Sequence, residues 1–245
     1  MRVDILASGS GGNVIAVQSS GNTILVDVGI AKTKIEKRLL EVGIRPDSID
    51  AILITHAHSD HVKGLPLANK YHIPVFASEG EWKSIKGVDS ELKRIMISNQ
   101  LISDFDVTSF NVYHDAFQPL GYSIVDRVGD KVSVCLDTGK VDSEMIEAMQ
   151  YSEFFIFESN HETAMLEHSN YPNSVKARIL SDTGHLSNKQ TAEALSKLVK
   201  GIGEKIYLTH LSSNNNLPEL AKLTTISVLS KNGFKVDEDY EIQVF

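Results

Sequence analysis

Residues 51–61 read AILITHAHSDH, an apolar run that ends in three histidines and one aspartate. The apolar run predicts a buried strand, and four potential metal ligands follow it within six residues: His56, His58, Asp60 and His61. A loop at the end of a strand can turn alternate side chains toward one point, and imidazole with carboxylate suits Zn, Mn or Fe. The alternative is an ordinary solvated polar loop. We favour a metal site, because three histidines in so short a run indicate a shared partner.

Three more potential ligands follow apolar runs elsewhere in the chain. His114 comes after FDVTSFNVY, Asp137 after KVSVCL, and His210 after KIYLT. Each residue taken alone is more typical of an ordinary loop. All three, like the histidine cluster, follow an apolar run, so we interpret them together as ligands. A site with one metal needs only three or four protein ligands, so this number of ligands favours two metals.

The segments around these residues predict the fold class. Residues 2–8, 13–19 and 22–29 predict three short antiparallel strands, and residues 31–42 predict an amphipathic helix. Ser187 and Gln190 have the spacing of a capping box at the start of a helix. Further strands are expected at 73–78, 106–113, 120–126, 131–136, 154–159, 205–210 and 240–245, with helices through 65–67, near 142–150, after 159 and at 217–233. Strands mixed with helices in both halves predict an α/β fold, an αββα sandwich of two sheets with helices outside.

Length and composition limit the class of protein. The chain has 245 residues of which 42% are hydrophobic, so we expect one domain over residues 1–245. No apolar stretch approaches the roughly 20 residues of a membrane span, and the lone Cys135, inside an apolar run, is typical of a buried thiol. We therefore expect a soluble cytoplasmic protein. The net charge of −8 argues against a basic surface that coats nucleic acid, but bound cations would reverse the local field.

Together, these motifs resemble the metallo-β-lactamase superfamily over nearly the whole chain. Asp27 in ILVDVG matches its first motif and THAHSDH its second, while the other three are matched by His114, by Asp137 in LDTG and by His210 in LTHLS. The resemblance implies two ligand sets joined by a bridging Asp137: His56, His58 and His114 for one metal, and Asp60, His61 and His210 for the other. It also implies that Asp27 orients ligands through hydrogen bonds.

Within the superfamily, the chain resembles the YycJ/WalJ group of small bacterial metallohydrolases. The matching segments are ASGSGGN, HDAFQPLGY, ESNHETAML, SDTGHLSN and THLSSNNNLPELA. That group is regarded as exonuclease-like, acting on DNA from the 5′ end, and the resemblance implies a dinuclear site of the Mn type. One departure is Glu162, which stands after His161 where an aspartate is expected.

Several polar residues outside the ligand sets are candidates for contact with a substrate. His185 precedes an expected helix start, where it could bind a phosphate oxygen or protonate a leaving group. The alternative is a structural loop residue. His161 and Glu158 could orient metal ligands or contact the substrate, with the same structural alternative. Asn215 is a further candidate substrate contact. Residues 9–13, GSGGN, could present N–H groups to a phosphate, but without a GxGxxG pattern they favour a plain turn.

The most concrete function that these patterns predict is metal-dependent hydrolysis of a phosphodiester, with Asp60 orienting the attacking water as well as binding metal. The resemblance favours DNA as the substrate. RNA ranks below it, because the chain is too short for the large inserted domain of RNA-processing relatives. A phosphodiesterase for small or cyclic nucleotides remains open, a thioester or lactam hydrolase is less favoured, and a regulatory protein with a non-catalytic metal is the alternative from another class.

Overall fold

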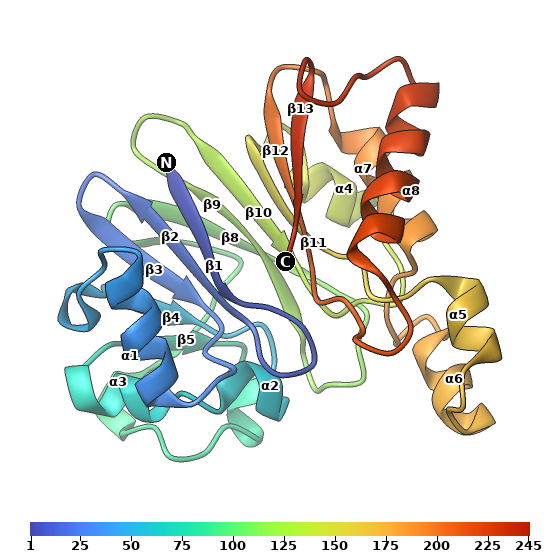
Figure 1. Cartoon of the computed structure of the whole chain (residues 1–245). Coiled ribbons are helices and arrows are strands. Elements are labelled where there is room, and N and C mark those ends of the chain that lie inside the picture. The colour runs from blue at the N-terminus through green and yellow to red at the C-terminus, as the bar shows by residue number, and fades with distance from the viewer. The chain divides into compact units, whose positions relative to one another are not determined.

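The structure, a computed structural model, describes residues 1–245, and the chain divides into two compact units (Figure 1). The first unit comprises residues 1–109 and 116–130, and the second comprises residues 110–115 and 131–245. Each unit contains both strands and helices. None of these helices has the length and apolarity that crossing a membrane requires.

The first unit is built on a sheet whose strands follow chain order: β1 (Arg2–Ala7), β2 (Val14–Ser19), β3 (Asn22–Val26), β4 (Ala51–Leu53), β5 (Val75–Ala77) and β6 (Lys93–Ile95). The first three strands pair antiparallel, as predicted, and the pairs from β3 to β6 are parallel. Ser20 and Gly21 both have positive φ, which permits the tight turn between β2 and β3.

Helices cover one face of this sheet. They are α1 (Lys32–Glu41), α2 (Ser59–Val62) and α3 (Pro66–Tyr71), with 3-10 turns at Pro46–Ser48, Glu81–Lys83 and Ser90–Leu92. Ile35 and Leu39 of α1 are fully buried in one cluster with Ile52 and Val75 of the sheet. The helix predicted over 31–42 is therefore confirmed, and its apolar stripe faces the sheet as the spacing requires.

Strands β7 (Asn99–Ile102), β8 (Phe105–Asn111) and β9 (Leu120–Val125) follow in the chain. β7 and β8 form an antiparallel hairpin. The Tyr122 hydroxyl donates a 2.6 Å hydrogen bond to the carbonyl of Ile54 and so fastens β9 to the segment that leads into the histidine cluster. The sequence did not predict β6 or β7, because β6 has three exposed residues and neither strand alternates apolar with polar positions.

The second unit has four parallel strands in the order β13, β12, β11 and β10. Their bounds are β10 (Lys131–Cys135), β11 (Phe154–Glu158), β12 (Glu204–Thr209) and β13 (Tyr240–Val244). The helices are α4 (Ser143–Met149), α5 (Thr163–His168), α6 (Asn173–Ile179), α7 (Asn188–Leu198) and α8 (Pro218–Lys231). Because neighbouring strands run parallel, their carboxyl ends meet at one edge of the sheet.

The helices of the second unit also pack on its sheet, with α4, α7 and α8 beside the strands in Figure 1. Phe155 and Phe157 of β11 are fully buried in one cluster with Leu195 of α7 and Leu229 of α8. In each unit, helices thus pack against a sheet. The predicted class, a mixed α/β fold with two sheets and helices, is confirmed.

The predicted capping box is present at the start of α7: Ser187 accepts from the Gln190 amide, and the Gln190 side chain accepts from the Ser187 amide. Replacing Ser187 by Ala removes the acceptor for one free N–H of the first turn, so we expect unfolding to become easier by about 1 kcal/mol. Urea denaturation measures the difference. Ser196→Ala is the control, since that hydroxyl donates to the Glu193 carbonyl within the same helix. Equal midpoints for the two variants would contradict the prediction.

Candidate metal centre

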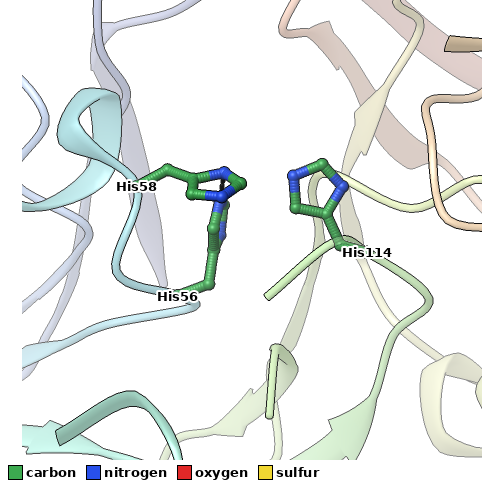
Figure 2. A group of neighbouring side chains, drawn as sticks. All are labelled: His56, His58 and His114. Carbon is green, nitrogen blue, oxygen red and sulfur yellow. Dashed lines mark hydrogen bonds between the residues drawn. The ribbon is translucent and has the colours of Figure 1, made fainter. Parts of the chain in front are cut away.

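The first two predicted ligands lie in the loop that follows β4. The His56 and His58 rings are 4.5 Å apart between centroids and nearly perpendicular, at 81°. Nε2 of His56 lies 3.0 Å from Nδ1 of His58, so two imidazole nitrogens converge, as Figure 2 shows. His114, which the same figure draws, belongs to the second unit.

Asp27 connects β3 to the same loop and is fully buried. Its Oδ1 accepts from the Thr55 amide at 2.8 Å, and its Oδ2 accepts from the Thr55 hydroxyl at 2.8 Å and from Nδ1 of His61 at 2.7 Å. Because Nδ1 of His61 donates, Nε2 carries the lone pair that a metal requires. Asp27 therefore has the contacts expected of a residue that orients a ligand.

The glycine-rich loop before β2, residues 9–13, contacts Asp60 and His61. The Asn13 amide donates to the Asp60 carbonyl at 2.8 Å, and its side-chain Oδ1 accepts from the Gly9 amide at 3.1 Å. That bond directs Nδ2 toward Nε2 of His61, which lies 3.3 Å away. The Gly12 amide is bonded to the Gly9 carbonyl. Three N–H groups of the loop, those of Gly9, Gly12 and Asn13, thus already have acceptors within the protein, which agrees with a turn rather than a phosphate cradle.

In the second unit, predicted ligands and their neighbours gather where the parallel strands end. Asp137 follows β10, Glu158 ends β11, and His210 follows β12. Together with His185, they offer ligand atoms that all lie within 4.8 Å of one another. Asp137 and His210 have positive φ values of 44° and 56°, so the backbone kinks into the left-handed region where each strand ends. Asp27, at the end of β3, does the same with a φ of 58°.

Glu158 organises this cluster and is fully buried. Its Oε1 accepts from Nδ1 of His185 at 2.6 Å and from Nδ1 of His210 at 2.9 Å, while Oε2 accepts from the amides of Thr138 and Leu186. Burial by itself would raise the pKa of Glu158, but the charge of His185 and the two histidine hydrogen bonds outweigh it and lower the pKa to about 2. The sequence indicated Glu158 only as a residue that could orient ligands or contact the substrate. Its central position is shown by its hydrogen bonds to residues far apart in the chain.

The pKa values of His185 and of the nearby His114 shift in opposite directions. For His185, burial works against the charged form, but the Glu158 carboxylate outweighs it and raises the pKa of His185 above its ordinary value. For His114, burial dominates and lowers the pKa. Nδ1 of His114 donates to the Gly184 carbonyl at 3.2 Å, which leaves Nε2 with the lone pair.

The structure buries both predicted substrate contacts. His161 and Asn215 are each 1% exposed, and the Glu162 amide donates to the Asn215 carbonyl. Both ring nitrogens of His161 lack a hydrogen-bond partner, and so does Oδ1 of Asn215. Burial lowers the pKa of His161 to about 4, so this ring is neutral at pH 7. A role in substrate binding stays a prediction for both residues.

The donor chemistry fits divalent cations in both units. Metal-binding histidines commonly donate their second N–H to a carboxylate or a carbonyl, which fixes the tautomer and the ring orientation. His61, His114 and His210 each make such a bond, to Asp27, Gly184 and Glu158 respectively. Imidazole nitrogen and aspartate oxygen form a ligand set suited to Zn, Mn or Fe.

Comparison with known proteins identifies the family. The model of the metallo-beta-lactamase superfamily matches residues 7–134, so the chain belongs to that superfamily. Two similar relatives are exodeoxyribonuclease YycJ from Bacillus anthracis and exodeoxyribonuclease WalJ from Streptococcus pneumoniae. The first is 37% identical, covering 99% of this chain and 94% of the relative, and the second is 39% identical, covering 98% and 93%.

Among solved structures, the metallo-beta-lactamase fold protein YhfI from Bacillus subtilis superposes with a TM-score of 0.75. The alignment covers 99% of this chain and 95% of YhfI at 14% sequence identity, which establishes a common fold. The predicted superfamily and its fold are therefore confirmed.

The lowered pKa of Glu158 predicts a pH-dependent stability in the metal-free protein. Because the pKa of Glu158 in the folded protein lies below the ordinary glutamate value of 4.5, the carboxylate stabilises the fold at pH values above 4.5, and this contribution disappears as the pH falls toward 2. We expect Glu158→Gln to lower the free energy of unfolding near pH 7 by about 3 kcal/mol. Chemical denaturation across the pH range should show the difference shrinking in acid. Glu219→Gln, at an exposed position, is the control; a constant difference for Glu158→Gln would refute the assignment.

Proposed function

We propose that this protein is a metal-dependent phosphodiester hydrolase that removes nucleotides from the 5′ end of DNA. The observation that carries the proposal is the similarity, over 98% or more of the chain, to two relatives named as exodeoxyribonucleases. The ligand-type residues at the strand ends of both units support it, because phosphodiester hydrolysis on this fold requires a metal site. The 5′ polarity rests on the resemblance to the YycJ/WalJ group.

We propose further that the two units act as one domain and supply the ligands of two divalent cations, Mn or Zn, with Fe as the alternative. The ligand sets are His56, His58 and His114 for one cation, Asp60, His61 and His210 for the other, and Asp137 between them. Membership of the superfamily and the orientation of His61, His114 and His210 support these sets. Two cations held by these residues would supply activated water and charge neutralisation for phosphodiester cleavage.

The chain's own residues contribute proton transfer and positioning. Asp60, with its side chain 26% exposed and 3.6 Å from Nε2 of His61, is proposed to orient the attacking water as well as to bind metal. His185, held by the hydrogen bond between its Nδ1 and Glu158, is proposed to give a proton to the leaving oxygen. His161 and Asn215 are proposed to contact the substrate. A cytoplasmic location stays a prediction.

The assignment predicts that the intact protein with Mn²⁺ shortens 5′-labelled single- or double-stranded DNA from the labelled end. Asp60→Ala should abolish cleavage, because the second cation loses a ligand and the water its orienting group. A chelator should abolish it as well. If the protein binds both metals and cuts no DNA, the exonuclease assignment fails, and small or cyclic nucleotide phosphodiesters become the substrates to test.

The role of His185 predicts a dependence on the leaving group. We expect His185→Gln to lower kcat on DNA by about 100-fold or more, because the leaving alkoxide then departs without a proton. On bis(p-nitrophenyl) phosphate the loss should be much smaller, since p-nitrophenolate is a good leaving group. Metal content, measured by elemental analysis, should be unchanged. Equal losses on both substrates would show that His185 does not act as the acid.

A further inference from the structure

The first unit contains a buried carboxylate that belongs to neither ligand set. Glu81 follows β5, begins the 3-10 turn Glu81–Lys83, and is 1% exposed. Its Oε2 accepts from the Ala57 amide at 2.7 Å, and its Oε1 accepts from the Gln118 amide at 2.7 Å. A buried carboxylate is costly unless its oxygens accept hydrogen bonds, so these two contacts hold it firmly in one place.

The contact to Ala57 bears directly on the metal ligands. Ala57 stands between His56 and His58, and its amide N–H belongs to the peptide unit that joins His56 to Ala57. The bond to Glu81 restrains the plane of that peptide unit, which lies between the backbone attachment points of the two rings. The two rings that flank this unit place their nitrogens 3.0 Å apart.

Glu81 is in turn held by its own segment. The Ser78 hydroxyl accepts from the Glu81 amide at 3.2 Å and donates to the Gln118 carbonyl at 2.8 Å. The Gly80 amide donates to the Gln118 side chain at 3.1 Å, and a Cβ on Gly80 would stand 2.6 Å from the Cβ of Gln118. Residues 78–81 are therefore fastened to Gln118 and present the carboxylate to Ala57 from a rigid base.

From this geometry, we infer that Glu81 is a positioning residue for the metal site, which sets the spacing of His56 and His58 through the Ala57 amide. The inference rests on the proposed metal role of these histidines and does not depend on DNA as the substrate. Removing a group that hydrogen-bonds a metal ligand typically changes metal affinity by about 10- to 100-fold, and we expect an effect of this order from Glu81.

The chain provides a matched control in Glu204. This carboxylate is 2% exposed and also accepts from two backbone amides, those of Lys200 at 2.6 Å and Ile202 at 3.0 Å. It stands at the first residue of β12, whereas His210 follows the other end of that strand. Glu204→Gln therefore reports the cost of weakening a buried carboxylate clamp that holds no ligand loop.

The experiment compares Co²⁺ binding by metal-free wild type, Glu81→Gln and Glu204→Gln, with a chromophoric chelator as competitor and the absorption spectrum of bound Co²⁺ as a second readout. Gln at position 81 keeps one acceptor and turns an NH₂ group toward the other amide. We expect Glu81→Gln to bind Co²⁺ about 10- to 100-fold more weakly and to shift its absorption bands. Glu204→Gln should lower the melting temperature and leave both readouts unchanged.

The inference would be overturned if Glu81→Gln bound Co²⁺ with the affinity and the spectrum of the wild type. It would also be overturned if Glu81→Gln and Glu204→Gln lost Co²⁺ affinity equally. If Glu81→Gln does not fold, Ser78→Ala replaces it, because that change loosens the support of Glu81 and keeps the carboxylate. It should then weaken Co²⁺ binding in the same direction, and unchanged binding would overturn the inference. Because no nucleic acid is used, a failure of the exonuclease assignment would leave this result intact.

Discussion

Hydrogen bonds from histidine to a buried carboxylate hold the candidate site in shape within each unit. Asp27 accepts from His61, and Glu158 accepts from His185 and His210; each carboxylate also accepts from backbone amides. Burying a carboxylate is unfavourable unless such donors surround it. The strand ends must therefore supply donors in fixed positions, and the ligand nitrogens are oriented before any cation arrives.

Apolar patterning made much of this arrangement predictable. Strands such as β4 and β11 are buried over their whole length, so they read as apolar runs, and the polar residue that follows each run marks the end of a strand. Asp137 and His210 were found by that rule, and the capping box at Ser187 by its own spacing. The superfamily followed from the order of the motifs, which a family model matching residues 7–134 confirms.

The features that escaped prediction depend on contacts between segments far apart in the chain. Glu81 meets Ala57 across 24 residues, and Asn13 meets His61 across 48. No local pattern distinguishes such a glutamate or asparagine from an exposed one. The short β6, with its sequence Lys-Arg-Ile fully exposed, is a strand because β5 pairs with it, and its own residues carry no such signal.

Three site residues, Asp27, Asp137 and His210, adopt left-handed backbone conformations. Aspartate, asparagine and histidine are the non-glycine residues that enter this region most readily, and two of these three types are also ordinary metal ligands. The kinked strand ends thus restrict their own replacement: β-branched or bulky side chains are disfavoured there, whereas asparagine and glycine are tolerated. In a related protein that kept the fold but lost metal binding, we therefore expect asparagine or glycine at these positions. Such substitutions would identify it as derived from a metal-binding ancestor.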